Sequence, residues 1–247
     1  MDEAIASLRA QELGDALEII VQDGDGYSRV ERVDGVKWFH EPDAGQSDAL
    51  NRGFAKAKGE WLFWLNADDI LLPGALKKVL DRINRIDRID WIAGDTVYID
   101  EQGKVIEVRT DAKWRGWFGK KLSAWTGGPS AFFRRELWKK RGGFDAGLKY
   151  AMDIDLWTRW AKAGERFLGL GEYVWGFRMH DESKTGSGRF AAEQAKELAA
   201  IDGKHGVSTM GFWRNVTRLA SLADGTWAKR RRDSARMHGK QWREWTG

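Results

Sequence analysis

Two pairs of acidic residues each follow a short apolar segment of the chain: Asp23 with Asp25, and Asp68 with Asp69. A carboxylate at the end of a buried strand is costly unless a cation, a donor or bulk water compensates it. Two carboxylates about 4 Å apart repel by ~4 kcal/mol at an effective dielectric constant near 20. A divalent cation removes that repulsion, so the pairs indicate a Mg²⁺ or Mn²⁺ site with positions open to phosphate oxygens. The alternative is that Asp68 or Asp69 only caps a helix beginning near Pro73.

Alternating strands and helices must position these carboxylates. Uninterrupted or alternating apolar residues predict strands at 17–21 (LEIIV), 36–39, 61–65 (WLFWL), 91–99 and 105–108. Apolar residues three and four positions apart predict helices at 2–13, 47–59, 73–83 and 153–163. Such alternation is typical of an open α/β sheet, which binds ligands at the carboxyl ends of its strands. The acidic pairs stand at such ends.

Composition narrows the chemistry. The chain has 247 residues, of which 42% are hydrophobic and 32% charged, as in a globular protein with a sizeable core. The formal charge of +4 is too small to indicate nucleic-acid binding by itself. The absence of cysteine excludes disulfides, thiolate nucleophiles and Cys-ligated zinc, and the 4 histidines are scattered. Any metal is therefore expected to be a hard cation on carboxylates.

Several long segments resemble family 2 glycosyltransferases. They are EPDAGQSDALNRGFAKAKGEWLFWLNADDILLPGAL, PSAFFRRELWKKRGGFDAGLKYAMDIDLWTRWAKAG and FRMHDESKTG, in the family's order. The resemblance covers residues 2–186. It implies an α/β fold of the GT-A, Rossmann-like type, with a mostly parallel central sheet flanked by helices. It also implies a nucleotide-diphosphate sugar as donor, UDP- or GDP-linked, and an acceptor hydroxyl in a glycan, a polysaccharide or a lipid-linked oligosaccharide.

The resemblance assigns roles to individual residues on the donor side. Asp23 matches the acidic residue that holds the nucleotide base, usually uracil, through its N3–H. The residues that match the nucleotide-sugar-binding segments are Gly45, Gln46, Ser47, Asp48, Asn51, Asn66, Ala67 and Asp68. Asn66 replaces the first acid of the family's DxD motif, so Asp68 is the first candidate ligand for Mn²⁺ or Mg²⁺ and Asp69 the second. His180 matches a late histidine near the diphosphate and completes the predicted metal set. The alternative for His180 is an ordinary hydrogen-bonded surface histidine.

The catalytic base that the resemblance implies is Asp153, in the segment MDIDLW. It would take the acceptor proton while the hydroxyl attacks the anomeric carbon from the face opposite the leaving group, which inverts the configuration. Asp155 as the base, with Asp153 only a helix cap, is the alternative. A helix N-terminus lowers the pKa of a carboxylate, whereas desolvation raises it. At helical spacing, Arg159 is expected to pair with Asp155.

The N-terminal region departs from the family pattern. The family opens with a strand of the type SIVIPTYN in the centre of the sheet, whereas residue 2 onward already matches the first family helix. Neighbouring strands would then keep unpaired backbone groups, so we expect the true start to lie upstream. Two domains are predicted: a catalytic domain at 1–186, divided into a nucleotide-sugar half (1–110) and an acceptor half (111–186), and a helical, basic extension at 187–247.

The extension has predicted helices at 190–201, 211–222 and 226–245. The last carries seven Lys or Arg residues beside Trp227, Trp242 and Trp245. Such a helix suits an anionic membrane surface, although packing of the tryptophans on the catalytic domain is the favoured interpretation. No targeting or membrane-spanning segment is seen, so we expect a cytoplasmic protein, with peripheral contact at the inner face of the cell membrane left open. Two alternative functions remain: a catalytically impaired nucleotide-sugar-binding protein, and a nucleic-acid-modifying glycosyltransferase that uses the basic tail. The sequence does not indicate an oligomeric state.

Overall fold

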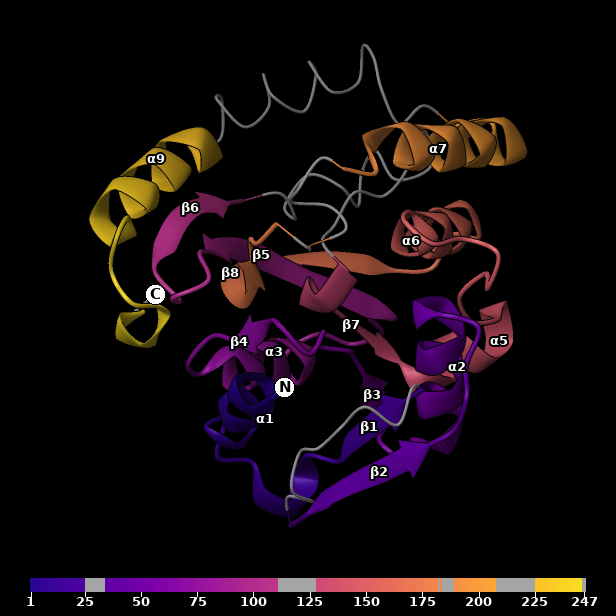
Figure 1. Ribbon diagram of the computed structural model, residues 1–247, viewed down its shortest axis with the longest axis horizontal. Coiled ribbons are helices and arrows are strands. Elements are labelled where there is room, and N and C mark those ends of the chain that lie inside the picture. Colours follow the sequence, from indigo (N-terminus) through magenta and orange to yellow (C-terminus); the bar gives the residue numbers. More distant parts are fainter. Residues whose placement is uncertain (25–33, 111–127, 182, 184–188, 208–224, 246–247) are drawn as a thin grey trace.

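The apolar segments of the chain form two sheets, and amphipathic helices cover them (Figure 1). A computed structural model of the protein describes residues 1–24, 34–110, 128–181, 183, 189–207 and 225–245. Asp25 and the predicted helix at 211–222 lie outside the described residues. Helix α1 (Asp2–Arg9) is shorter than predicted because Glu12 and Gly14 adopt positive φ angles of 54° and 50°, which a helix does not accommodate.

The smaller sheet is parallel and has two strands. Strand β1 (Ile19–Asp23) follows the 3-10 turn η1 (Gly14–Ala16) and pairs with β2 (Val36–His40), with Ile19 opposite Val36. Helix α2 (Gln46–Lys56) then carries the chain back to β3 (Trp61–Leu62). The predicted strand at 61–65 is thus paired only over its first two residues.

The larger sheet has six strands. They are β3, β4 (Ile70–Leu71), β5 (Trp91–Ile99), β6 (Val105–Arg109), β7 (Ala131–Arg134) and β8 (Phe167–Arg178). The order is β3-β7-β5-β8-β4, and β6 pairs with β5 outside that path. The α/β fold is confirmed, but the expectation of a mostly parallel sheet is wrong. Because β7 runs antiparallel between β3 and β5, the sheet is mixed, and among the described strands only β1–β2 and β5–β8 pair in parallel.

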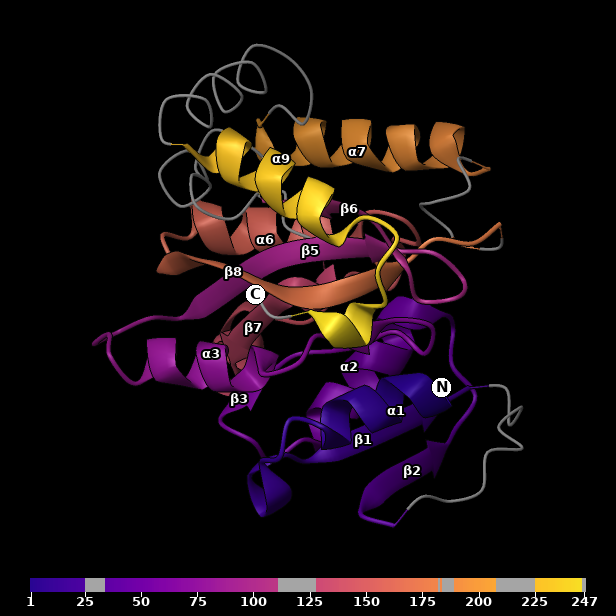
Figure 2. The same ribbon diagram turned by 90° about the vertical axis from the view of Figure 1, so that its left-hand side faces the viewer.

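Helices lie on both sides of the larger sheet. Helix α3 (Ala75–Ile83) and α1 lie on one side, and α6 (Met152–Lys162) with α7 (Ala191–His205) on the other (Figure 2). Helix α5 (Arg135–Arg141) follows β7 directly. Helix α3 begins at Ala75 with Gly74 as its N-cap and has no side-chain cap, so neither acidic residue of the 68–69 pair caps it.

Aromatic rings fill the core between the larger sheet and α6. The ring centroids of Trp91 and Trp157 lie 5.1 Å apart at an interplanar angle of 11°, and Trp160 meets both rings edge-on. Pairs of this kind contribute about 0.5–1.5 kcal/mol each beyond the area that they bury. Trp64, Trp157 and Trp160 are buried in this core, while Trp61 and Trp138 are only partly buried.

The C-terminal segment packs on β6 rather than projecting from the molecule. Helix α9 (Thr226–Met237) ends where the chain turns through Gly239 at a φ of 76°, so the predicted helix at 226–245 is about eight residues too long. The 3-10 turn η3 (Trp242–Glu244) follows, and Trp242 and Trp245 are buried beside Tyr173. Trp227 is 40% exposed. In the part of the chain that the structure describes, no helix has the length and apolarity to cross a bilayer.

Candidate active site

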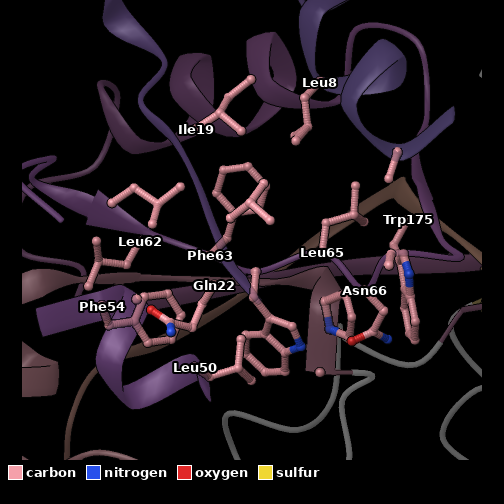
Figure 3. Close-up of a pocket in the computed structure, with 18 of the residues that line it drawn as sticks. Leu8, Ile19, Gln22, Leu50, Phe54, Leu62, Phe63, Leu65, Asn66 and Trp175 are labelled. Carbon is pink, nitrogen blue, oxygen red and sulfur yellow. The ribbon is translucent and has the colours of Figure 1, made fainter. Parts of the chain in front are cut away.

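One large cavity brings half of the predicted site residues together. Its volume is about 1340 Å³, and it extends from the space between β1 and the segment 61–65 to the loop that follows that segment (Figure 3). One end is apolar. The polar end is lined by Gln46, Asn66, Asp68, Asp153 and His180. Two carboxylates, two amides and an imidazole therefore meet at the carboxyl end of the strands, as expected for an α/β sheet.

Asp69 holds the loop 66–69 in place from inside the protein. Its side chain is fully buried, and its two oxygens accept hydrogen bonds from the Arg178 backbone N–H (2.9 Å) and the Asn66 side-chain amide (2.7 Å). Burial, together with the charge of Asp68, raises the pKa of Asp69 to about 7. A second metal ligand would have to reach the cavity, and Asp69 does not line it. Both oxygens of its carboxylate already accept hydrogen bonds inside the protein.

Asp68 is presented to solvent and to His180. Its carboxylate is 43% exposed, and Oδ2 lies 2.9 Å from the His180 Nε2. His180 stands two residues beyond β8, so the strand and the loop 66–69 bring the two side chains together. In the described ranges there is no group of three or more His, Cys, Asp or Glu residues placed to hold a metal ion. Asp68 and His180 can offer one carboxylate and one imidazole, which suits a hard cation that takes its other ligands from water and phosphate.

Arg178 fixes the position of the same loop, and sequence reasoning missed it. Its guanidinium donates to the backbone carbonyls of Asp68 (2.8 Å), Asp100 (3.1 Å) and Glu101 (2.9 Å), and it forms an ion pair with Glu3. The loop is thereby tied to β8, to the end of β5 and to the first turn of α1. The segment FRMHDES contains Arg178, but no pattern in the amino-acid sequence indicates that its guanidinium would donate to backbone carbonyl groups.

Asp153 lies at the start of α6 and faces the cavity. Its Oδ1 accepts the Ile154 backbone N–H at 2.9 Å, and the N–H groups of Asp153 itself and of Gly128 also point to the carboxylate. Burial raises the pKa of Asp153 to about 6, because these donors only partly offset the loss of hydration. Of the two opposing effects expected at this helix start, desolvation is the larger. The group is therefore mostly ionised at neutral pH and accepts a proton readily.

Gly128 and Trp64 form the wall behind Asp153, and neither was predicted. A Cβ atom on Gly128 would lie 2.3 Å from Trp64 Cζ2 and 3.2 Å from Asp153 Oδ2. The sequence marks this stretch only as a Gly-Gly-Pro breaker at 127–129. Trp64 stacks on Trp157 with ring centroids 5.9 Å apart, so the aromatic core fixes the wall.

Glu197 of α7 anchors the turn that leads into α6. Its carboxylate accepts the backbone N–H groups of Lys149 (2.9 Å), Tyr150 (2.8 Å) and Ala151 (2.9 Å). Ala151 is the N-cap of α6, and the helix has no side-chain cap of its own. A residue of the predicted C-terminal extension thus positions the helix start that carries Asp153.

Asp155 lies elsewhere and has a structural role. Its side chain is fully buried, and its oxygens contact Arg159 (2.7 Å), His205 (2.9 Å) and Lys204 (3.1 Å). The predicted pairing of Arg159 with Asp155 is confirmed. Asp155 does not line the cavity. The geometry therefore favours Asp153 over Asp155 as a base that an acceptor can reach.

The predicted nucleotide-binding residues divide into two groups. Gln46 lines the cavity with Ala67, and its amide nitrogen lies 2.9 Å from the Asn66 Oδ1. Ser47 and Asn51 instead join α2 to the segment 144–148: the Ser47 hydroxyl donates to Leu148 O (2.8 Å), and Asn51 exchanges two hydrogen bonds of 2.9 Å with the Phe144 backbone.

The remaining residues of the donor side lie near the start of α2. Gly45 is the N-cap of the helix at a φ of 117°, which favours glycine. Asp48 accepts the Ala44 N–H and pairs with Arg52, both at 3.0 Å. Asp23 ends β1, and its Oδ2 lies 3.1 Å from the His40 Nδ1. Gly45, Asp48 and Asp23 do not line the large cavity.

A model of the family described as Glycosyl transferase family 2 matches residues 1–151. The chain belongs to this family. An uncharacterized glycosyltransferase of Rickettsia typhi is 27% identical to this family 2 chain over 234 residues, covering 88% of the chain and 69% of the relative. Another, from Rickettsia conorii, is 30% identical over 172 residues, covering 64% of the chain and 28% of the relative. This family 2 chain therefore spans less than a third of the second relative's length.

Solved structures of similar fold include S. aureus TarS and a mannosyltransferase. S. aureus TarS (residues 1–349) in complex with UDP-GlcNAc matches with a TM-score of 0.58 at 16% identity, covering 81% of the family 2 chain and 61% of TarS. The mannosyltransferase PcManGT from Pyrobaculum calidifontis, in complex with GDP-Man and Mn²⁺, matches with a TM-score of 0.56 at 17% identity, covering 82% and 59%. At these identities the likeness shows the fold, which is GT-A.

Proposed function

We propose that this chain transfers a sugar from a nucleotide-diphosphate sugar to an acceptor hydroxyl, with inversion at the anomeric carbon. The observation that carries the proposal is the position of Asp153, a carboxylate with a pKa raised to about 6, on the same cavity as Asn66, Asp68 and His180. A general base with a pKa just below neutral pH is both ionised and basic enough to accept a proton during attack. Family membership and the GT-A fold support the same reaction.

The two sides of the reaction would use different parts of the cavity. The acceptor hydroxyl would lose its proton to Asp153 as its oxygen attacks the anomeric carbon, and the nucleotide diphosphate would leave from the opposite face. Gln46 and Asn66, whose side-chain amides lie 2.9 Å apart, would contact the donor. Asp23, which follows the cavity-lining Gln22 but does not itself line the cavity, would hold the base. UDP-GlcNAc and GDP-Man, the donors bound in the similar structures, are the first to test.

A divalent cation fits the pair formed by Asp68 and His180. Both side chains line the cavity, and their carboxylate oxygen and imidazole nitrogen lie 2.9 Å apart. Bound there, Mn²⁺ or Mg²⁺ would stabilise the charge on the departing diphosphate. Arg178 and Asp69 would keep Asp68 in position from behind, through the Asp68 carbonyl and the Asn66 amide. The acceptor, proposed as a glycan or a lipid-linked oligosaccharide, would approach from the side of Asp153.

The test is sugar transfer and donor hydrolysis with UDP-GlcNAc and GDP-mannose, with and without Mn²⁺, followed by mass spectrometry. Asp153→Asn is expected to lower turnover by about 10²–10⁴-fold, which is the usual contribution of a general base, while UDP binding by calorimetry is kept. Asp68→Asn is expected to weaken Mn²⁺-dependent UDP binding, and Asp81→Asn, at an exposed position on α3, is the matched control. Full turnover in Asp153→Asn would refute the assignment of the base. UDP binding without turnover in the unaltered chain would favour the alternative of a binding protein.

The basic C-terminal segment does not favour the nucleic-acid alternative. Lys229 donates to Gly171 O (2.9 Å), Arg230 donates to Val108 O (2.8 Å), and Arg243 pairs with Glu3 (2.9 Å). Several of its cations are thus engaged in holding the segment to the rest of the protein. Salt-sensitive binding to a DNA duplex would revive that alternative.

A further inference from the structure

A second cavity, here called the side cavity, lies next to the large one. Its volume is about 290 Å³, and it is lined by the start of α2, the turn 146–150 and Phe190. Lys149 and Tyr150 line both cavities. The large cavity and the side cavity therefore meet at these two residues.

The shared residues stand at the start of α6. Tyr150 directly precedes the N-cap of this helix, and Asp153 lies in its first turn. Asp68 and His180, which are proposed for the metal and the diphosphate, line only the large cavity. The side cavity thus begins beside the proposed base and lies apart from the residues proposed for the leaving group.

The start of α2 forms one wall of the side cavity. Gly45 and Ser47 line the side cavity and not the large one, whereas Gln46 between them lines the large one. The Ser47 hydroxyl donates to Leu148 O at 2.8 Å, which joins this wall to the opposite turn. The start of α2 therefore stands between the side cavity and the proposed donor side.

Two aromatic rings form a platform in the side cavity. The ring centroids of Tyr150 and Phe190 lie 5.3 Å apart at an interplanar angle of 29°, so the rings stack. Both residues line the side cavity and are partly exposed. The platform thus presents apolar ring surface to water, and a ligand that covered it would gain from removing that surface from water.

Polar groups surround the platform. Gln194 of α7 lines the large cavity together with Lys149 and Tyr150. In the part of the chain that the structure describes, the Lys149 ammonium, the Gln194 side-chain amide and the Tyr150 hydroxyl form no hydrogen bond or ion pair. All three can donate to an oxygen atom, and the amide and the hydroxyl can also accept. The region therefore combines an apolar ring surface with hydrogen-bonding groups at its edge.

A sugar ring matches this combination. Its C–H face is apolar and its edge carries hydroxyl groups, so it can cover an aromatic ring while its hydroxyls bond to amide and ammonium groups. A phosphate group would require more cations, and Lys149 is the only charged residue among the described ones that line the side cavity. An acyl chain would remove the polar groups from water without replacing their hydrogen bonds.

Helix α7 holds the platform in place. Figure 2 shows α7 lying over α6, and apolar side chains of the two helices pack together. Glu197 accepts the backbone N–H groups of Lys149 and Tyr150, at 2.9 and 2.8 Å. Phe190 is the N-cap of α7, and Gln194 lies in the same helix. One helix therefore supplies part of the platform and fixes the rest, and a site that is ordered in advance loses little entropy on binding.

We propose that Tyr150 and Phe190 bind a second sugar residue of the acceptor, next to the residue whose hydroxyl lies beside Asp153. Lys149 and Gln194 donate to the hydroxyls of this second residue. The assignment rests on the proposed function, since that function places the acceptor at Asp153. The acceptor is then a glycan of at least two sugar residues. Helix α7, which lies beyond the segment matched by the family model, selects it.

The experiment measures binding of the full chain to an array of mono- and oligosaccharides, with and without UDP and Mn²⁺. Calorimetry then gives the Kd of the glycans that bind. Phe190→Ala and Tyr150→Ala each remove a ring, whereas Phe190→Tyr and Tyr150→Phe keep one. Trp227→Ala is the aromatic control, because Trp227 is exposed on α9 and lines neither cavity. Gln194→Ala is matched by Lys196→Ala, at an exposed position of α7 that also lines neither cavity. Thermal unfolding shows that each variant is folded.

The unaltered chain is expected to bind an oligosaccharide roughly tenfold more tightly than the monosaccharide at its end, and loss of either ring is expected to remove this difference. The variants that keep a ring and the two controls should stay within about twofold of the unaltered chain. Once a transferred acceptor is known, Phe190→Ala should raise its KM and leave donor hydrolysis unchanged.

Three results would overturn the proposal: equal binding of monosaccharides and oligosaccharides, equal effects of Phe190→Ala and Trp227→Ala, or no binding of any glycan by the unaltered chain. Glycan binding that requires both rings, without any sugar transfer, would support the platform and count against the proposed function alone.

Discussion

Replacing Asp153 by Asn should make the protein more stable, and the gain should depend on pH. Burial raises the pKa of Asp153 from an ordinary 3.8 to about 6, so the folded state binds the proton more tightly than the unfolded state does. The ionised carboxylate therefore destabilises the fold. This cost is fully present above pH 6 and fades as the pH falls toward 3.8. Asn keeps a side-chain oxygen for the N–H donors but carries no charge.

The size of the effect follows from the pKa. A change of about two units at ~1.36 kcal/mol per unit gives about 3 kcal/mol, of which about 2 kcal/mol is expected to remain because the side chain is partly exposed. At pH 8 the Asn variant should gain this whole amount in the free energy of unfolding. At pH 5, where most of the folded protein already carries the proton, the gain should fall to roughly half.

Asp155 provides a control two residues along the same helix. Burial alone would raise the pKa of Asp155, but hydrogen bonds from His205, Arg159 and Lys204 outweigh it and lower the pKa. Its charge thus stabilises the fold above its ordinary pKa, and the stabilisation is lost only as the pH falls through the lowered value. Asp155→Asn should therefore destabilise the protein at both pH 5 and pH 8, by roughly 2–4 kcal/mol, because it leaves buried partners uncompensated.

Urea denaturation of the three proteins at pH 5 and pH 8 measures these differences. An Asp153→Asn variant that is less stable than the unaltered chain at pH 8 would refute the reasoning. So would a gain that is the same at both pH values, because it would then have a cause other than the ionised carboxylate.

Three further predictions concern the same cavity and its supports. Gly128→Ala should lower the free energy of unfolding by about 1–3 kcal/mol and reduce turnover, because its Cβ would lie 2.3 Å from Trp64 Cζ2. The control Gly203→Ala, whose Cβ would have no atom within 4 Å, should be neutral or stabilising. Urea denaturation and initial rates measure both effects, and unchanged values for Gly128→Ala would contradict the prediction. Trp242→Ala should destabilise by about 3–5 kcal/mol and Trp227→Ala by less than about 1 kcal/mol in the same assay, since Trp242 is buried and Trp227 is 40% exposed; equal effects would mean that η3 is not packed as described. The pH profile of kcat/KM should fall about tenfold per unit below pH 6, where Asp153 is protonated, and level off above it; a profile that is flat down to pH 5 would exclude Asp153 as the base.

Sequence patterns predicted the elements whose burial is regular. β1, β2, α2, α3, β5 and α6 all form within a few residues of their expected positions, because each has an apolar face of the right period or an uninterrupted apolar run. Strand β8, the 12-residue strand that pairs with both β5 and β4, was not predicted. Its sequence FLGLGEYVWGFR contains three glycines, and these weaken the strand signal although Gly176 packs directly against Ile70.

Sequence reasoning located the polar residues of the site but not what holds them. Asp68, Asp153 and His180 do line one cavity, although their roles there remain predictions. Asp69 was interpreted as a ligand because adjacent carboxylates resemble a metal site, and its burial depends on contacts with Arg178 more than a hundred residues away. Contacts of that range leave no local pattern in the sequence.

The anchor that Glu197 provides bears on how the chain can be divided. The family model ends at residue 151, which is the N-cap of α6, so Asp153 and Glu197 both lie beyond it. A chimera that exchanges everything after residue 148 with a relative would transfer Asp153, Glu197 and the three backbone N–H groups that Glu197 accepts together. A chimera joined at residue 187, the boundary suggested by composition, would separate them and leave three backbone N–H groups without their acceptor. Chimeras that divide donor from acceptor specificity should therefore be joined before Lys149.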